Sequence, residues 1–236
     1  MKMQSFADIQ HVMYINLDSR PDRRTHIEKQ LKTLGLTTYE RFPAIKLANG
    51  RAGCSISHLK CIQNAKDRGF MHVLICEDDT EFLNPALVKT QFNTFLQSYP
   101  TLKWDVIMLA GNNVPPYKRL SAAAIQVAHC QTTTCYLVHH RYYDTLLQNI
   151  REGLNLLVRM PTQHFHYAID KYWLRLQKTD RWFLITPPTV VQRDDYSDIE
   201  KKTIKYGRLM TDLDKPWLQQ RKGTGEGRTI ISGLVK

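Results

Sequence analysis

The sequence has no long apolar run, and this absence excludes a membrane-spanning helix of the usual kind. No hydrophobic stretch in its 236 residues reaches the roughly 18 that such a helix needs. The first ten residues, MKMQSFADIQ, also lack the apolar segment of a secretory signal. We therefore expect a cytoplasmic protein that makes at most peripheral contact with a membrane.

Cysteine is sparse, and its spacing gives no sign of a crosslink. No two cysteines form a Cys-x-x-Cys pair, their number is odd, and most lie in apolar surroundings: Cys54, Cys61, Cys76, Cys130 and Cys135. Such a pattern disfavours both a disulfide framework and a structural zinc site. We expect buried, reduced thiols, and hence a reducing compartment.

Three common motifs are missing, and each absence removes a class of enzyme. A hydride-transfer fold needs G-x-G-x-x-G after its first strand, but the corresponding turn reads NLDSRP at residues 16–21. A phosphate-cradling P-loop is absent, as is the G-x-S-x-G of many esterases. The chemistry must therefore come from other residues.

Negative charge is in short supply, since 33 Lys and Arg residues stand against 22 Asp and Glu, for a net charge of +11. A basic surface attracts nucleic acids, anionic membranes or phosphorylated small molecules. The basic residues are dispersed, with local density at 20–24 and 201–228, and no basic helix is interleaved with aromatics. We expect no nucleic-acid partner, because only the charge supports one.

What the chain does contain is the composition of a globular domain, 42% hydrophobic and 23% charged. Buried strands are expected at residues 11–17, 39–45, 71–76 and 104–109. Helices are expected from residue 18 or 19 to 34, from Ser55 or Ser57 to Gly69, and at 85–98. This alternation predicts an α/β fold with a parallel or mostly parallel central sheet covered on both faces by helices.

The second half of the chain has a mixed pattern. Shorter strands are expected at residues 125–128, 135–138, 182–185 and 189–192, and helices at 142–150 and 166–176. After residue 198 the hydrophobic periodicity thins while Lys, Arg and Gly accumulate. We therefore expect residues 200–236 to form a basic C-terminal tail that is poorly packed or depends on a partner.

The stretch MHVLICEDDTEF, at residues 71–82, joins an apolar strand to three carboxylates: Glu77, Asp78 and Asp79. A parallel sheet binds ligands beyond the carboxyl ends of its strands, which is where these acids stand. A hard divalent cation that arrives with phosphates would neutralise their mutual repulsion. A solvated acidic turn would give the same pattern, and the spacing alone leaves the two interpretations level.

Arginines gather near the turn that follows the first strand, at Arg20, Arg23 and Arg24. The positive end of a helix dipole disfavours cations there, which mildly favours an anionic partner for at least one of them over a solvated first turn. His58 lies in the first turns of the next expected helix. It can contact a phosphate or satisfy a nearby carbonyl, and the second reading is the simpler one.

Asp170 is a lone acid in the second half, beside the aromatic residues Tyr167, Tyr172 and Trp173. A carboxylate among aromatic rings suits sugar hydroxyls. An exposed acid paired with Lys171 or Arg175 is the simpler interpretation of the same residues.

Five segments together resemble the motifs of one family. YINLDSRPDRR at 14–24, GCSISHLKCI at 53–62 and VLICEDD at 73–79 look like the three N-terminal motifs of glycosyltransferase family 25. TTTCYLVHH at 132–140 and VVQRDDYSDI at 190–199 resemble its later segments. The order and spacing match over roughly residues 12–199.

The resemblance implies a fold, a donor and a cofactor. The family's fold is GT-A, which implies one domain over residues 1–199, with a nucleotide-sugar half at 1–110 and an acceptor half at 111–199. The donor would be a UDP-sugar, UDP-galactose or UDP-glucose, used with inversion at the anomeric carbon. The acceptor would be a glycan, a glycolipid or a glycosylated protein, and the cofactor Mn²⁺ or Mg²⁺. The sequence leaves the oligomeric state open.

The resemblance also implies roles for particular residues. Glu77 and Asp79 would hold the metal, because alternate residues of an extended strand point the same way, and Asp78 would meet the ribose or support the site. The expected base that deprotonates the acceptor is Asp170, with Asp198 second. The remaining donor contacts would be Asn16, Leu17, Arg20, Arg24, Ser57 and His58. Gln192 and Asp198 are candidates for contacting the acceptor or supporting the site.

One departure from the family pattern concerns the threonine run at 132–134, which stands where a small Gly-Thr start is more usual. It leaves the shape of the sugar pocket open. A non-catalytic module of the same fold that holds a nucleotide or glycan is the alternative function.

Overall fold

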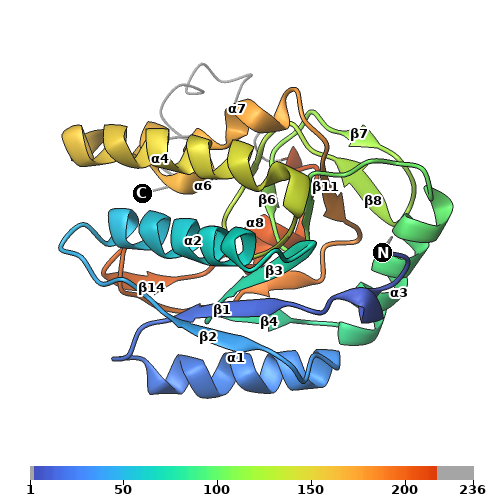
Figure 1. Cartoon of the computed structure of the whole chain (residues 1–236), viewed down its shortest axis with the longest axis horizontal. Helices are drawn as coiled ribbons and strands as arrows, with labels where there is room; N and C mark the ends of the chain where they lie inside the picture. The colour runs from blue at the N-terminus through green and yellow to red at the C-terminus, as the bar shows by residue number, and fades with distance from the viewer. Residues whose placement is uncertain (1–2, 217–236) are drawn as a thin grey trace.

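The computed structural model describes residues 3–216 of the chain, which form an α/β domain around one large sheet (Figure 1). Its eight strands lie in the order β2-β1-β3-β10-β5-β11-β8-β7. In chain order they are β1 (Val12–Asn16), β2 (Glu40–Pro43), β3 (His72–Glu77), β5 (Val106–Met108), β7 (Lys118–Arg119), β8 (Ala124–Gln126), β10 (Cys135–His139) and β11 (Trp182–Ile185). Strands β8 and β10 run against the others.

Helices cover both faces of this sheet, and each face has its own hydrophobic core. Figure 1 shows α1 on one side of the sheet and α2 and α4 on the other. The longer helices are α1 (Pro21–Leu34), α2 (Gly50–Asp67), α3 (Pro85–Ser98) and α4 (Tyr143–Arg159). An α/β domain with a mostly parallel sheet covered by helices is what the sequence predicts, and the structure confirms it.

The remaining elements are short. Pairs of strands outside the large sheet are β4 (Thr80–Phe82) with β12 (Val190–Gln192), β6 (Asn112–Asn113) with β9 (Cys130–Gln131), and β13 (Asp195–Ser197) with β14 (Lys202–Ile204). The short helices are η1 (Phe6–Asp8), η2 (His140–Tyr142), η3 (Pro161–Gln163), α5 (His164–Tyr167), α6 (Ile169–Tyr172), α7 (Leu174–Gln177) and α8 (Gly207–Thr211).

Side-chain alternation along β3 determines which layer each residue meets. Val73 and Ile75 pack into the core beneath α2 and α4, whereas Leu74 and Cys76 pack into the core beneath α1 and α3. The period of two continues to the strand's last residue, so Glu77 faces the α2 side. This places a carboxylate next to α2 at the carboxyl edge of the sheet.

Helix α2 begins earlier than the sequence pattern indicates. It starts at Gly50 rather than at Ser55 or Ser57, because the side chain of Asn49 caps it by accepting a hydrogen bond from the Ala52 amide at 3.3 Å. Gly50, Arg51 and Ala52, which precede the expected start, therefore form its first turn. As a result, Cys54 and His58 both lie within regular helix, one turn apart.

The second half differs more from expectation. The helix expected at 142–150 continues to Arg159, while the one expected at 166–176 is split into α5, α6 and α7. The first of these breaks comes at Ala168, whose ψ of 148° is extended rather than helical. The helical spacing of the buried residues of α4 continues through Gly153 to Leu157, so the expected end at residue 150 was too early.

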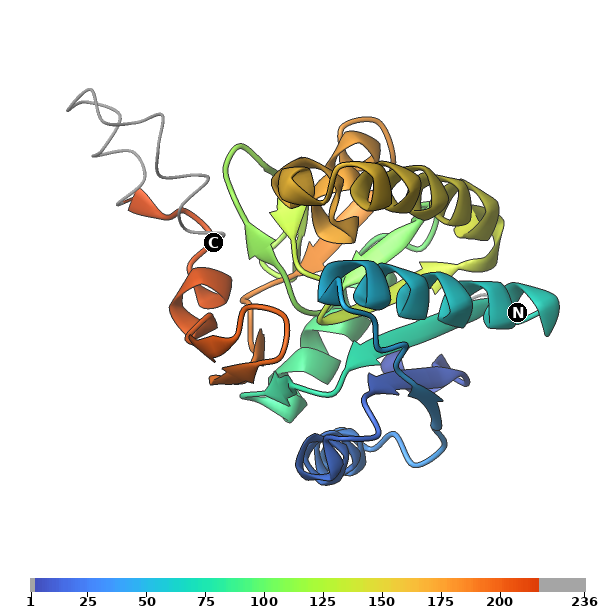
Figure 2. The same cartoon turned by 90° about the vertical axis from the view of Figure 1, so that its left-hand side faces the viewer.

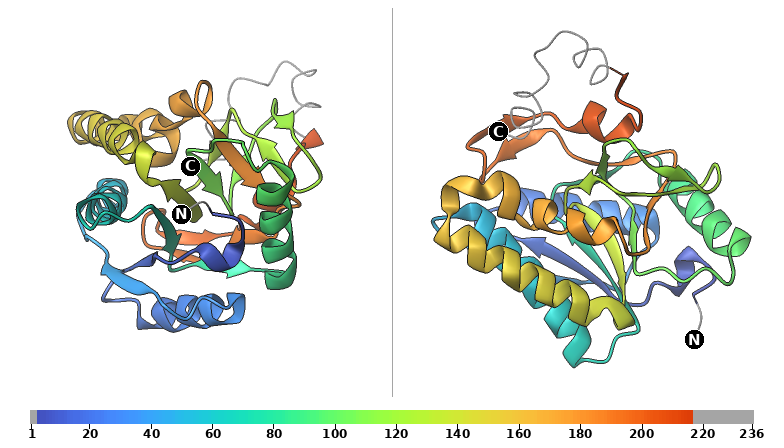
Figure 3. Two further views of the ribbon diagram at one scale, coloured as in Figure 1. Left: turned by 45° about the vertical axis from the view of Figure 1, so that its right-hand side comes forward. Right: turned by 90° about the horizontal axis from the view of Figure 1, so that it is seen from above.

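The C-terminal segment runs beside the carboxyl edge of the sheet (Figure 2; Figure 3, right). Within the part of the expected tail that the structure describes, α8 buries Met210, whose sulfur lies 3.2 Å from the Gln192 amide nitrogen. Residues 200–216 are thus packed more closely than expected, and the rest of the tail lies outside the described residues. The division of the domain at residues 110 and 199 stays a prediction.

Two general expectations can be compared with the structure. All five cysteines are free, with four of them buried and Cys54 partly exposed. None of the helices described between residues 3 and 216 is both long and apolar enough to span a bilayer.

Candidate active site

The three acids after β3 do not continue the strand. Glu77 is its last residue, and Asp78 and Asp79 form a turn into β4. We expected Glu77 and Asp79 to point the same way because they alternate along an extended strand. This reason is wrong, since Asp79 lies in a turn and not in the strand. The two side chains nevertheless line one cavity, because the turn directs Asp79 back toward it.

Glu77 is held by three side chains on its α2 side. His58 Nε2 lies 3.1 Å from Oε1, the Thr133 hydroxyl donates to the same oxygen at 2.7 Å, and the Cys54 sulfur lies 3.8 Å away. Burial alone would raise the pKa of Glu77, but the contacts with His58 and Thr133 outweigh it and lower that pKa. Glu77 is thus kept as a carboxylate.

Asp79 is buried, with 4% of its surface exposed, and only one of its carboxylate oxygens has partners. Oδ2 accepts from Arg23 at 2.9 Å and from Gln192 at 2.8 Å, whereas Oδ1 has no partner among the described residues. Burial and, next, the neighbouring Glu77 raise the pKa of Asp79 to about 7.

A divalent cation fits this arrangement. An orphaned carboxylate oxygen beside a second carboxylate is a poor environment for two negative charges, and oxygen ligands of this kind suit Mn²⁺ or Mg²⁺. Arg23 supplies part of the compensating charge. The residues that could hold a hard cation are therefore Glu77 and Asp79.

Asp78 and Asn16 support the site from behind. The Asn16 amide donates to Asp78 at 2.7 Å and to the Arg20 carbonyl at 2.9 Å, and Arg23 donates to Asp78 at 3.1 Å. Burial raises the pKa of Asp78. Asn16 is 1% exposed and lines neither of the cavities described below, so it positions its neighbours.

The arginines of α1 separate into two groups. Arg20 and Arg23 are three residues apart and line the cavity, while Arg24 is half exposed and pairs with Glu28 at 3.0 Å. Arg20 is the N-cap residue of α1, and Arg23 and Arg24 are adjacent helical residues whose side chains point about 100° apart around the axis. The structure thus brings Arg23, and not Arg24, to the acids.

Arg20 and Arg23 also bind the segment that follows β12. Arg20 pairs with Asp198 at 2.8 Å and Asp195 at 2.9 Å, and Arg23 pairs with Asp195 at 3.2 Å. These pairs join α1 to the β13 hairpin. Asp198 and Arg20 are therefore in contact, although they are far apart in the sequence.

Glycine at position 53 allows α2 to approach the acids. A Cβ there would lie 2.3 Å from the Ile45 carbonyl oxygen, too close for any side chain. Ser57 fixes the same contact, since its hydroxyl accepts from the Ile45 amide at 2.9 Å and donates to the Gly53 carbonyl at 2.8 Å. The close packing brings Cys54 and His58 to Glu77.

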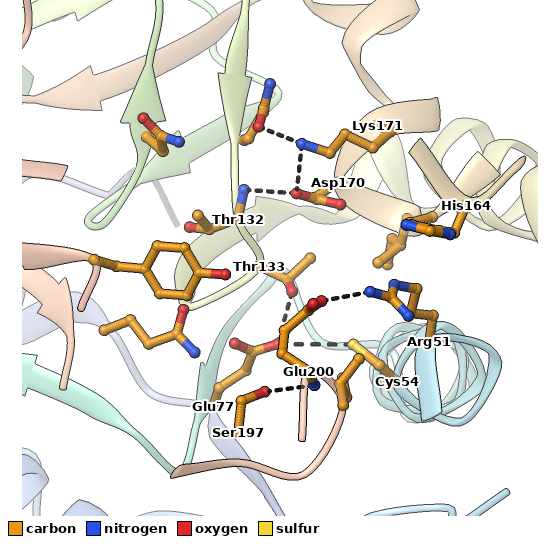
Figure 4. Close-up of a pocket in the computed structure, with 17 residues that line it drawn as sticks. Arg51, Cys54, Glu77, Thr132, Thr133, His164, Asp170, Lys171, Ser197 and Glu200 are labelled. Atoms are coloured by element: carbon orange, nitrogen blue, oxygen red, sulfur yellow. Dashed lines mark hydrogen bonds and ion pairs between the residues drawn. The ribbon is translucent and has the colours of Figure 1, made fainter. Parts of the chain in front are cut away.

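Two cavities open at this edge of the sheet. The first, which we call the arginine-side cavity, is lined in part by Leu17, Arg20, Arg23, Ser57, His58, Glu77, Asp78, Asp79 and Asp198. The second, the threonine-side cavity, is lined in part by Arg51, Glu77, Asn112, Gln131, Thr132, Thr133, His164, Asp170, Lys171, Glu200 and Tyr206 (Figure 4). Both are lined by Cys54, Glu77, Gln192, Ser197 and Ile199, so they share one wall.

Asp170 lies in the threonine-side cavity on α6. Its Oδ2 accepts from the Thr132 amide at 3.3 Å and lies 3.8 Å from the Lys171 ammonium (Figure 4). Burial lowers the pKa of Lys171, and Asp170 is the largest influence that opposes this. Asp170 is thus a partly exposed carboxylate that faces the space next to Glu77.

Sequence reasoning missed several residues of these cavities. Arg51 and Glu200, which pair with each other, and Tyr206 had no distinguishing signal. Cys54 and Thr133 lie inside quoted motifs but were not given roles. Arg23 was noted beside Arg20, but helical spacing does not distinguish it from Arg24, because three and four residues are equally typical of one helix face.

The sequence can now be compared with known proteins. A model of glycosyltransferase family 25, described as an LPS biosynthesis protein, matches residues 38–144. The match covers less than half of the chain, so the similarity to this family is established over that region. The resemblance is thereby confirmed over those residues, and the mostly parallel sheet agrees with the expected α/β fold class. A sugar transferase activity in general is supported, and no curated protein matches the sequence.

Solved structures with similar folds were also found. A glycosyltransferase involved in glycosylating the major capsid of PBCV-1 has 12% identity, a TM-score of 0.44, and coverage of 81% of this chain and 95% of its own. A Drosophila β1,4-galactosyltransferase 7 variant, in complex with manganese, UDP-Gal and xylobiose, has 12% identity and a TM-score of 0.41, with 83% and 75% covered. Mannose-1-phosphate geranyltransferase from Thermus thermophilus has 8% identity and a TM-score of 0.42, with 81% and 75% covered.

Proposed function

We propose that this protein transfers a hexose, galactose or glucose, from a UDP-sugar to a hydroxyl group of a glycan, a glycolipid or a glycosylated protein. The observation that carries the proposal is the pair of cavities that share a wall at Glu77. A transferase needs two adjoining sites so that the acceptor can approach the donor's anomeric carbon. The family match supports the reaction class.

The arginine-side cavity is the proposed donor site. Its cations, Arg20 and Arg23, lie within reach of a diphosphate, and the backbone next to Leu17 and the face of α2 at Ser57 and His58 line the remaining space. Glu77 and Asp79 would hold Mn²⁺ or Mg²⁺ there. The cation would supply positive charge to the leaving UDP. Asp78 would meet the ribose or keep Arg23 in place.

The threonine-side cavity is the proposed acceptor site, and Asp170 is the proposed base. Its carboxylate would take the proton of the acceptor hydroxyl while that oxygen attacks the anomeric carbon from the face opposite UDP. This direction of attack inverts the anomeric configuration. Gln192 and Ser197 lie on the shared wall, where they could orient the acceptor, and Asp198 is the second candidate for the base.

The test is a panel of UDP-sugars assayed for released UDP in the presence of Mn²⁺, with and without simple sugar acceptors. We expect release with UDP-galactose or UDP-glucose that an acceptor stimulates. Asp170→Asn should retain donor binding and lose the stimulated reaction by about 100-fold or more, in the range of a positioned general base. Asp144→Asn, a highly exposed acid on α4, is the matched control and should behave as wild type.

Two outcomes would count against the proposal. Donor binding without release from any UDP-sugar would favour the alternative, a non-catalytic nucleotide- or glycan-binding module. Stimulated turnover that survives in Asp170→Asn would move the base to another residue, with Asp198→Asn as the next variant.

A further inference from the structure

A second cluster of potential ligands meets Glu77 from the α2 side. Cys54 and His58 are one helical turn apart, and their side chains converge on the same carboxylate. The His58 Nε2 to Glu77 Oε1 distance is 3.1 Å, the Cys54 sulfur to Glu77 Oε1 distance is 3.8 Å, and all three ligand atoms lie within 4.8 Å of one another. The proposed donor chemistry uses the oxygen ligands of Asp79 and Glu77, and leaves the thiol unused.

These distances suit a small tetrahedral cation. With typical zinc bonds of about 2.0–2.3 Å, tetrahedral angles place nitrogen and oxygen ligands roughly 3.4 Å apart, and sulfur and oxygen ligands roughly 3.6 Å apart. The observed distances of 3.1 and 3.8 Å differ from these by a few tenths of an ångström. The third pair, His58 Nε2 and Cys54 Sγ, lies within 4.8 Å and would have to close to roughly 3.6 Å.

Neighbouring side chains hold the potential ligands of this cluster in fixed orientations. His58 is 1% exposed and its Nδ1 lies 2.8 Å from the Tyr136 hydroxyl, which fixes the ring so that Nε2 points at Glu77. The Thr133 hydroxyl orients Glu77 through its 2.7 Å hydrogen bond. Cys54 lines both cavities, so a cation has a path to the cluster and the fourth position can face open space.

We propose that Cys54, His58 and Glu77 form a second cation site that takes a borderline-soft divalent ion, Zn²⁺ or its spectroscopic substitute Co²⁺, with the fourth position open. Thiolate and imidazole ligands favour such ions over Mg²⁺ and Mn²⁺. Binding displaces the Cys54 thiol proton to solvent. Without the ion, Nε2 donates its proton to Glu77. In the bound state the imidazole carries its one proton on Nδ1 instead, donating to the Tyr136 hydroxyl, and Nε2 binds the ion.

Because both proposed cation sites use Glu77, an ion in one should weaken binding of an ion in the other. This consequence rests on the proposed function. An ion in the Cys54–His58–Glu77 cluster draws Glu77 away from a cation at Asp79. Zn²⁺ should therefore oppose Mn²⁺-supported donor binding, and Cys54→Ala should be less sensitive to it.

The experiment is an optical titration of the full chain with Co²⁺, without nucleotide or sugar. We expect d–d bands of tetrahedral intensity and a near-ultraviolet thiolate-to-cobalt charge-transfer band at one equivalent, both reversed by Zn²⁺. Cys54→Ala should remove the charge-transfer band. Cys61→Ala, which removes a buried thiol from the same helix, is the matched control and should keep it.

Two further variants test the remaining assignments. Tyr136→Phe keeps the ring but not the hydroxyl, and should weaken Co²⁺ binding by about 10–100-fold. Asp79→Asn should keep the band, which separates this site from the proposed donor cation. Circular dichroism of each variant establishes that it is folded.

The proposal is overturned if folded wild type gives no charge-transfer band, or if the band survives in Cys54→Ala. It is also overturned if Asp79→Asn removes the band while leaving the fold intact. A failure of the proposed transferase activity would leave these spectra unaffected, because they need neither donor nor turnover.

Discussion

At the scale of single residues, Arg23 has the largest share of the site's charge compensation. Its guanidinium lies 2.9 Å from Asp79, 3.1 Å from Asp78 and 3.2 Å from Asp195, and it also donates to the Tyr196 carbonyl at 2.9 Å. Burial lowers the pKa of Arg23, but the carboxylates more than offset this and raise it. Without this cation, buried acids would face one another unpaired.

Replacing Arg23 should therefore be costly. We expect Arg23→Met, which keeps most of the side-chain stem, to reduce the free energy of unfolding by about 2–3 kcal/mol, less than a fully buried pair would lose. Arg24→Met, at the adjacent and exposed position, should change stability little. Urea unfolding of both variants measures the difference.

A second readout of the same variants uses Mn²⁺. If a cation occupies Glu77 and Asp79, saturating Mn²⁺ should restore part of the stability that Arg23→Met loses, because it replaces the missing positive charge. Equal stability of the two variants without metal would contradict the assigned role of Arg23.

Thr132 is strained, and the strain lies at the proposed acceptor site. Its φ of 76° is in the left-handed region, which is unfavourable for a β-branched residue. The same conformation directs its amide to Asp170 at 3.3 Å. The left-handed backbone explains why a small residue is more usual at this position, and it makes threonine there a costly departure.

Thr132→Gly should consequently stabilise the fold. Relief of the left-handed strain is worth about 1–3 kcal/mol, and the added flexibility of glycine offsets part of it, so we expect a net gain of roughly 1 kcal/mol. Thr203→Gly in β14, where the backbone is extended, should instead be destabilising. Thermal unfolding of the two variants measures these changes. If Thr132→Gly lost as much stability as Thr203→Gly, the result would contradict the assigned strain.

At the scale of elements, β10 is the antiparallel strand in the middle of the sheet. It lies antiparallel between β3 and β5, and its entry carries Thr133 and Thr134 to the acids. Its other end carries His139, whose ring packs against Trp104 with centroids 5.0 Å apart. One strand thus links the site to the opposite edge of the sheet.

His139 gives the fold a pH dependence that is separate from the site. Burial and, next, the charge of Arg141 lower its pKa from 6.5 to about 4. The unfolded chain then binds more protons than the folded one between these values, so stability is lost as pH falls from about 6.5 to 4.

The matching variant is His139→Asn, which retains a side-chain acceptor for the Arg141 amide. The difference in unfolding free energy between pH 7 and pH 5 should be smaller in this variant than in wild type by on the order of 1 kcal/mol, after allowance for partial exposure of the ring. Denaturant curves at the two pH values measure it. An unchanged difference would show that other groups carry the acid sensitivity.

Element prediction from the sequence succeeded where local periodicity was strong. The strands before and after α1 and the acidic end of β3 followed from apolar runs, and α1 ends at Leu34 as expected. The start of α2 was placed too late, because its first turn contains Gly50 and Gly53, and glycine favours loops. Only the contact of Gly53 with Ile45 explains why glycine is helical there.

At the scale of the whole molecule, the acidic residues of the site could be identified from the sequence, but their contacts with one another and with distant residues could not be predicted. The contact between Gln192 and Asp79 depends on the pairing of β12 with β4, and the contacts of Asp195 and Asp198 depend on the β13 hairpin reaching α1. These pairings join residues more than a hundred positions apart, and no local pattern encodes them. The wall shared by the two cavities, at Glu77, became visible only in the assembled structure.

Titration of UDP into the protein by calorimetry, with and without Mn²⁺, tests the central claim of a cation held at Glu77 and Asp79. The result expected is binding that Mn²⁺ strengthens at least tenfold in wild type, with little strengthening in Asp79→Asn. Equal affinity for UDP with and without Mn²⁺ in wild type would contradict the claim.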